Sequence, residues 1–211
     1  MLKGLFYPDV NFEELFIPYI YKEIYFDGVY VDILNERKDM VIMDVGANIG
    51  IVTDYMRPHA KKIYSIEPST EHFEALKKNK EFNKWDNVEI FKMALADKDG
   101  EMNLNLNEKN RTCHSLTLDY KQKGEMVKTM RFDTFMKKNK IKEVDFCKFD
   151  VEGAEDMILR SEGFINVADK IKSIEVEFHF PSFPSLIEHM QKLGYRARRY
   201  DCSAVVVLFT R

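Results

Sequence analysis

The sequence predicts an α/β fold with a mostly parallel sheet, and three observations support this prediction. Apolar runs of strand length alternate with helical patterns along the 211 residues. The run at 40–45 ends in an acid and then in Gly46 and Gly50, as a buried strand does when it turns sharply into a helix. A second run, at 62–67, ends in Glu67, the position where α/β nucleotide-binding folds hold ribose hydroxyls.

The individual elements follow from periodicity and from helix-start residues. Residues 11–38 have a helical, aromatic-rich pattern, so we expect 1–38 to form an N-terminal helical extension. Further strands are expected over 87–93, 144–149, 171–178, 195–200 and 203–210, and helices over 49–57, 71–82, 153–161 and 183–193. Ser69 or Thr70 should cap the helix at 71–82, and Asp133 a short helix after 131.

The segment 101–131 differs from the rest of the chain and is expected to be an insertion of strands and loop. Residues 101–107 alternate as an exposed strand does, 107–125 are polar and rich in turn residues, and 126–131 form another strand. Long loops in such folds tend to be functional, so the loop is expected to face the substrate through Arg111, His114 and Ser115. No internal repeat or linker occurs, and we expect a single domain over 1–211.

Composition argues against several classes of function. A net charge of −3 and a pI of about 6.0 provide no general attraction for nucleic acid, which makes a nucleic-acid partner unfavoured. Three scattered cysteines, Cys113, Cys147 and Cys202, are too few for a disulfide framework or a zinc site, and Cys147 is expected in the core. With no signal-peptide core and no membrane span in the sequence, a cytoplasmic location is expected.

The glycine spacing decides which adenosine-containing cofactor fits the first turn. A dinucleotide fingerprint requires glycine at positions 46, 48 and 51, but this chain has Asn48 and Ile51. No phosphate-binding loop of the G-x-x-x-x-G-K-[ST] type occurs either. The D-x-G-x-x-x-G pattern at 44–50 instead resembles the first motif of Rossmann-like methyltransferases that use S-adenosylmethionine, which carries no phosphate. A simple packing turn is the alternative interpretation.

The strand at 144–149 leads into a second motif, K-F-D-V-E-G-A-E at 148–155. Asp150 should face the same crevice as Asp44 and Glu67, because ligands bind beyond the carboxyl ends of parallel strands. The two motifs, with I-E-P at 66–68, the turn at 94–100 and R-F-D-T-F at 131–135, come in an order that resembles the FkbM family of S-adenosylmethionine-dependent methyltransferases.

This resemblance implies a Rossmann-like, three-layer methyltransferase fold with an antiparallel last strand, and methyl transfer to a hydroxyl of a small molecule, sugar or lipid. It implies that Asp44 and the Gly46–Gly50 turn hold the methionine end of the cofactor and that Glu67 accepts the ribose hydroxyls. The full set of cofactor-binding residues expected on this basis is Asp44, Gly46, Ala47, Asn48, Gly50, Glu67, Pro68, Met93, Ala94 and Asp97, the last three along the adenine.

A hydroxyl acceptor benefits from a general base, and Asp150 is our first candidate. On the strand at 171–178, Glu175, Glu177 and His179 alternate and so project from one face, with Glu177 and His179 nearest its end. His179 is expected to act as a base near neutral pH without a large pKa shift. We expect no metal ion, although Mg²⁺ on Asp150, Glu177 and His179 is an open alternative.

Other classes of function can be compared with the sequence in the same way. An amino-type nucleic-acid methyltransferase would carry N/D-P-P-Y after the strand at 144–149, and this chain has no proline there. A nicotinamide-dependent oxidoreductase fails on the glycine spacing. A ribose methyltransferase acting on RNA and a catalytically silent cofactor-binding module are the remaining alternatives. The acceptor and the oligomeric state do not follow from the sequence.

Overall fold

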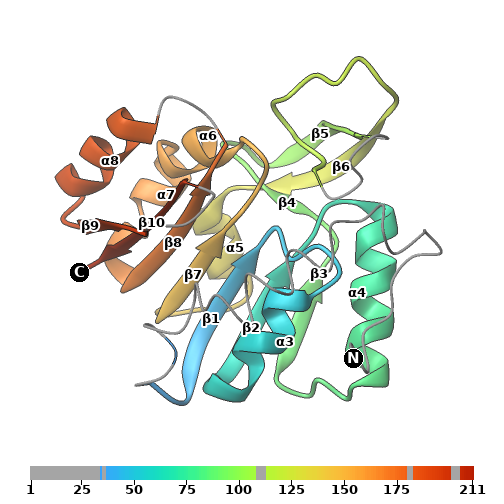
Figure 1. Ribbon diagram of the computed structural model, residues 1–211, viewed down its shortest axis with the longest axis horizontal. Helices are drawn as coiled ribbons and strands as arrows, with labels where there is room; N and C mark the ends of the chain where they lie inside the picture. Colours follow the sequence, from blue (N-terminus) through green and yellow to red (C-terminus); the bar gives the residue numbers. More distant parts are fainter. Residues whose placement is uncertain (1–33, 35–36, 108–112, 180–182, 201–204) are drawn as a thin grey trace.

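A computed structural model describes residues 34, 37–107, 113–179, 183–200 and 205–211 (Figure 1). The expected N-terminal extension falls almost entirely outside these residues, as do Arg111 and Cys202. The expectations for them stay predictions, as does the single domain.

A seven-stranded sheet forms the centre of the fold, in the order β3-β2-β1-β7-β8-β10-β9 (Figure 1). Pairing is parallel from β3 to β8, whereas β10 runs antiparallel to both β8 and β9. The expected mostly parallel sheet with an antiparallel last strand is confirmed. The strands span Met40–Val45 (β1), Ala60–Ile66 (β2), Val88–Phe91 (β3), Phe146–Phe149 (β7), Ser173–Phe178 (β8), Arg196–Arg199 (β9) and Val205–Thr210 (β10).

Helices cover both faces of this sheet, which gives three layers (Figure 1). One buried cluster joins β1 and β2 to α3 and α4 and includes Trp85, and another joins β7 and β8 to the helices α5 to α8. The aromatic rings of Phe132, Phe149 and Phe164 pack together in the second cluster. The helices span Ile51–Met56 (α3), Thr70–Phe82 (α4), Phe132–Lys138 (α5), Glu155–Leu159 (α6), Glu162–Ile165 (α7) and Phe183–Lys192 (α8).

A second, three-stranded sheet of order β4-β6-β5 takes β6 and most of β5 from the segment predicted as an insertion, whereas β4 precedes that segment. Its strands are Ala94–Leu95 (β4), Gly100–Asn105 (β5) and Gly124–Met130 (β6). The strand expected over 87–93 is therefore wrong at its end, because the chain leaves the large sheet after Phe91 and pairs with β6 instead.

Two details of helix termini also differ from expectation. Arg131, not Asp133, is the N-cap residue of α5, and Asp133 lies in the first turn, where its carboxylate accepts hydrogen bonds from the Arg131 guanidinium. Ser69 is the N-cap of α4, as expected, but its side chain makes no capping bond. The backbone N–H of Thr70 donates instead to the Glu125 carboxylate on β6, at 2.8 Å.

The direction of chain connection reverses between β1 and β7. From β1 the chain continues outward to β2 and β3, whereas β7 pairs on the other side of β1 and continues to β8. In open α/β sheets ligands bind beyond the carboxyl ends of the strands at such a switch point. The fold therefore places a binding site at the ends of β1 and β7.

Candidate active site

A cavity lies at this switch point, with an empty volume of about 920 Å³ that includes some open solvent. Apolar side chains form most of its wall, among them Val45 and Ile66 of the large sheet and Leu95 and Leu104 of the small one. Three carboxylate side chains also line the cavity, those of Glu67, Asp150 and Glu152. An apolar cavity with a few well-placed polar groups is the usual form of a cofactor site.

The turn between β1 and α3 requires glycine at two positions. Gly46 and Gly50 have φ angles of 81° and 94°. A Cβ added at Gly46 would clash with the backbone oxygen of Asp150, and one at Gly50 would lie 2.7 Å from the Leu76 side chain. Gly46 therefore lets the ends of β1 and β7 approach each other, while Gly50 lets the turn pack on α4.

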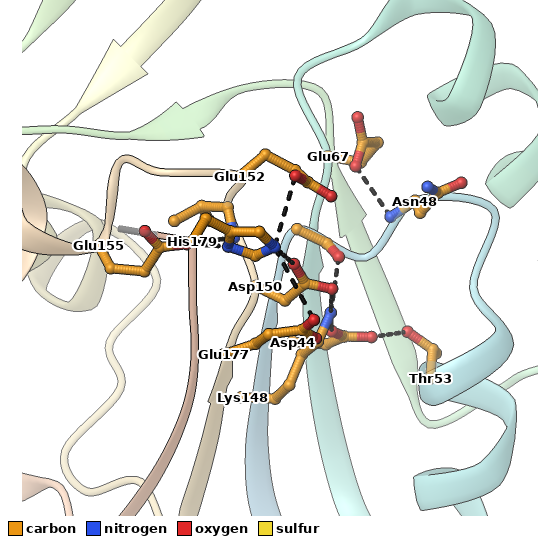
Figure 2. Close-up of polar contacts among 12 residues, drawn as sticks. Asp44, Asn48, Thr53, Glu67, Lys148, Asp150, Glu152, Glu155, Glu177 and His179 are labelled. Atoms are coloured by element: carbon orange, nitrogen blue, oxygen red, sulfur yellow. Dashed lines mark hydrogen bonds and ion pairs between the residues drawn. The ribbon is translucent and has the colours of Figure 1, made fainter. Parts of the chain in front are cut away.

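Glu67, directly after β2, is 5% exposed and lines the cavity, and Figure 2 shows its carboxylate beside Asn48. Its Oε2 accepts the backbone N–H of Asn48 at 2.8 Å, and its Oε1 accepts that of Ser69 at 2.9 Å. His72 lies beside the same carboxylate and stacks on the ring of His114, with the centroids 4.8 Å apart. One carboxylate thus connects the β1 turn to the start of α4.

A buried lysine holds the ends of β1 and β7 together (Figure 2). The Nζ of Lys148 donates to the backbone oxygen of Gly46 at 2.9 Å and lies 3.5 Å from Asp44 Oδ1 and 3.3 Å from Asp150 Oδ2. Asp44 is fully buried, and burial raises its pKa despite the Lys148 charge and a bond of 2.5 Å from the Thr53 hydroxyl. Although burial opposes the charged form, nearby carboxylates raise the pKa of Lys148, so it stays cationic.

Asp150 and Glu152, which line the cavity, face an imidazole surrounded by carboxylates (Figure 2). His179, directly after β8, places its Nε2 at 3.4 Å from Glu152 Oε2 and at 3.8 Å from Asp150 Oδ1. Its Nδ1 lies 3.0 Å from the Oε1 of buried Glu155, which also accepts the backbone N–H groups of Val151 and Gly153. Glu155 therefore orders the turn into α6.

The titration of this cluster corrects one expectation. Burial alone would lower the pKa of His179, but the hydrogen bond to Glu155 and the charges of Asp150 and Glu152 raise it to about 10. This pKa keeps His179 protonated at neutral pH and contradicts the expectation of no large shift, while the catalytic role of His179 stays a prediction. Burial and the charge of Asp150 raise the pKa of Glu152 to about 7, so Glu152 titrates near neutrality instead.

The structure brings most of the predicted site residues to this cavity. Gly46, Ala47, Asn48, Glu67, Pro68, Ala94 and Asp150 line it. Asp44 lies beneath the turn, Gly50 packs on α4, and Asp97 is exposed on the loop after β4. Met93 borders a separate hollow beside β3 and β6, and the roles proposed for these four residues stay predictions.

Three functional candidates were missed from the sequence. Lys148 interrupts the apolar run of β7, an unusual place for a charge, but the sequence does not show its partners. Glu152 has a φ of 50°, which turns its side chain toward the cavity, and the Ser115 hydroxyl donates to its backbone oxygen. His72 sits among polar residues of α4, and only the fold brings it to Glu67.

The fold and this site together define a Rossmann-like methyltransferase that uses S-adenosylmethionine. A family model described as Methyltransferase FkbM domain matches residues 44–197, and the chain belongs to this family. Methyltransferase 1 of Beauveria bassiana (strain ARSEF 2860) is 28% identical over 171 residues, which cover 70% of this chain and 68% of the relative.

Solved structures share the fold at low sequence identity. Methyltransferase FkbM from Methylobacillus flagellatus KT has a TM-score of 0.59 and 14% identity; the match covers 90% of this chain but only 48% of that protein. An rRNA methylase from Streptococcus thermophilus has a TM-score of 0.56 and 11% identity, covering 85% and 92% of the two chains. Within the described part of the chain, no helix has the length and apolarity needed to cross a membrane.

Proposed function

We propose that this methyltransferase acts on a hydroxyl oxygen of a small molecule, a sugar or a lipid. The observation that carries the proposal is the pair of carboxylates, Asp150 and Glu152, on the wall of the cavity at the end of β7. A hydroxyl must lose a proton when it is methylated, and a carboxylate at the site of transfer can accept it.

The two ends of the cavity suggest how the cofactor lies. Glu67, beside His72, is proposed to accept hydrogen bonds from the ribose hydroxyls, since each of its oxygens has a lone pair beyond the one used by the backbone. The backbone of the Gly46–Gly50 turn would then face the methionine end. This orientation directs the sulfonium methyl toward Asp150 and Glu152.

The transfer is an in-line displacement at the methyl carbon. A lone pair of the acceptor oxygen forms the new C–O bond, the C–S bond breaks, and its electron pair stays on sulfur in S-adenosylhomocysteine. Asp150 takes the hydroxyl proton, a contribution of about 10²–10⁴ in rate for a well-placed base. The protonated His179 keeps the neighbouring Glu152 oriented and offsets part of the negative charge.

RNA ribose methylation is the second candidate, and the rRNA methylase with the same fold is a reason to test it. The carboxylates around His179 argue against it, because they would repel a phosphate backbone. A silent module that binds the cofactor without transfer is the third alternative.

Calorimetric titration with S-adenosylhomocysteine, with NADH and ATP as controls, tests the cofactor assignment. We expect one molecule of the thioether per chain and no heat from the controls; a preference for NADH would refute it.

Measurements of turnover test the role of Asp150. They use methyl-labelled S-adenosylmethionine with a panel of sugars, lipids and other hydroxyl compounds, and with RNA as a separate arm. Asp150→Asn should bind S-adenosylhomocysteine normally and lose about 10²–10⁴ in rate. Asp156→Asn, at a half-buried acid of α6 that pairs with Arg160, is the matched control. Normal turnover of Asp150→Asn would show that another group is the base.

A further inference from the structure

The carboxylates around His179 are spaced too widely to be explained as hydrogen-bond partners of its Nε2. The distances from Nε2 are 3.4 Å to Glu152, 3.8 Å to Asp150 and 3.8 Å to Glu177. A charge-assisted N–H···O bond would be about 2.7–2.9 Å long. Three carboxylates therefore face one ring nitrogen, and none of them is close enough to form a charge-assisted hydrogen bond of that length.

This spacing fits ligands arranged around a shared ion. One ligand atom each from Asp150, Glu152 and His179 lies within 4.8 Å of the other two. For metal–ligand bonds of about 2.0–2.2 Å, adjacent ligands lie roughly 3 Å apart and opposite ligands roughly 4.2 Å apart. A small movement of these partly exposed side chains would bring all three atoms within bonding distance of one ion.

The other side of the imidazole is held as in protein metal sites. Ligating histidines donate their second ring N–H to a carboxylate or carbonyl, which fixes the tautomer and the ring orientation. His179 Nδ1 lies 3.0 Å from Glu155 Oε1, and this carboxylate is 3% exposed and is itself held by the N–H groups of Val151 and Gly153. Nε2 faces Asp150 and Glu152 (Figure 2), and a cation bound there would displace the Nε2 proton of the imidazolium while the Nδ1 proton stays in the hydrogen bond to Glu155.

The negative charge around the imidazole also favours a bound cation. Four carboxylates, those of Asp150, Glu152, Glu155 and Glu177, surround the imidazole within 3.8 Å. The lysine beside them, Lys148, is shared between Asp150 and the buried Asp44. A bound cation would reduce the repulsion among these acids.

We propose that Asp150, Glu152 and His179 bind a divalent cation beside the cofactor cavity, which Asp150 and Glu152 line. Two carboxylates and one imidazole favour an ion that accepts mainly oxygen ligands, such as Mn²⁺ or Mg²⁺. The site differs from the magnesium alternative considered from the sequence, since Glu152 replaces Glu177 and Glu155 supports the histidine. Its role in the reaction rests on the proposed function: the ion would hold the acceptor oxygen and lower the pKa of its hydroxyl.

Titration of the EDTA-treated chain with Mn²⁺, followed by electron paramagnetic resonance of the free ion, tests the site directly. One Mn²⁺ should bind per chain. His179→Gln and Glu152→Gln should weaken binding at least tenfold, and Glu155→Gln by about 10–100-fold. Glu143→Gln, an exposed acid near Lys172, should bind as the unaltered chain does. Absence of bound Mn²⁺, or unchanged affinity in both His179→Gln and Glu152→Gln, would overturn the proposal.

Titrating the same samples with S-adenosylhomocysteine separates the two proposals. Thioether binding without Mn²⁺ binding would overturn the cation site and leave the methyltransferase function standing. Mn²⁺ binding that depends on His179, without thioether binding, would support the site and contradict the proposed function. Far-ultraviolet circular dichroism confirms folding of each variant, and Glu152→Gln, at a partly exposed position, is the variant least expected to unfold.

Discussion

Glu67 is the residue at which structure and cofactor binding are most closely connected. Its carboxylate accepts one backbone N–H from the β1 turn and one from the start of α4. A glutamine here would direct its NH₂ group at one of these donors, so it is not a neutral replacement. The same carboxylate is proposed to bind the ribose, and its removal should therefore affect the turn and the ligand together.

We expect Glu67→Ala to weaken S-adenosylhomocysteine binding at least tenfold, since hydrogen bonds to a charged group contribute about 1.5–3 kcal/mol. Calorimetric titration measures this, with Glu74→Ala on the exposed side of α4 as the control. Equal affinities for the two variants would mean that Glu67 does not contact the ribose.

The pairing of Lys148 with Asp44 makes a different prediction, on stability. Lys148→Met would leave the buried Asp44 without its cation and the Gly46 oxygen without its donor. Loss of one partner of a buried ion pair typically costs about 3–5 kcal/mol, which we expect to see in the free energy of unfolding by urea. The double variant with Asp44→Asn should lose less than the sum of the two single changes, because the orphaned charge is gone. Strict additivity would show that the pair is not coupled.

At the scale of elements, sequence pattern predicted most strands and helices because buried parallel strands are distinct in composition. The run 41–45 is apolar apart from Asp44 and is followed by Gly46. The close approach of β7 explains both the acid and the glycine, because Asp44 pairs with Lys148 and Gly46 lies against the backbone of Asp150. The end of the strand expected over 87–93 was wrong because apolar residues occur on both sides of the point where the chain changes sheets, Ile90 and Phe91 before it and Met93 and Ala94 after it. Only tertiary pairing decides that Phe91 belongs to one sheet and Ala94 to the other.

Part of the site could also be predicted from the pattern of buried strands. Asp150 and Glu67 follow strands directly, so topology places them at one edge of the sheet. The direction of the Glu152 side chain depends on the positive φ of that residue. The pKa of His179 depends on Asp150 and Glu152, which follow β7, and on Glu155 of α6, and these acids meet the imidazole only in the fold. Such properties arise from distances between segments, which a linear pattern does not contain.

The turn after β1 gives a prediction for one element. Gly46→Ala should destabilise the protein and abolish thioether binding, because the new Cβ would collide with the backbone of Asp150 and push β1 and β7 apart. Gly100→Ala is the matched control, since Gly100 has a φ of 143° but open space around it. Thermal unfolding and calorimetry of both variants separate the strain of a positive φ from the clash. Comparable losses in the two would indicate that the close approach at Gly46 is unimportant.

At the scale of the molecule, the cavity lies between two sheets and not within one. Its wall takes Val45 and Ile66 from the large sheet and Leu95 and Leu104 from the small one, while Asp150 stands at the end of β7. A ligand that fills it contacts both sheets and the turns that join them. Ligand binding should therefore stabilise the fold as a whole against unfolding.

This stabilisation can be predicted from linkage. A ligand present at 100 times its Kd and bound only by the folded chain adds about 2.7 kcal/mol at 25 °C. For a chain of this size each kcal/mol corresponds to about 2–4 °C, so S-adenosylhomocysteine should raise Tm by roughly 5–11 °C in a calorimetric scan. NADH at the same concentration should leave Tm unchanged, because Asn48 and Ile51 replace the glycines that a pyrophosphate requires. A shift with NADH and none with the thioether would show that the cavity at the β1–β7 switch point binds a dinucleotide.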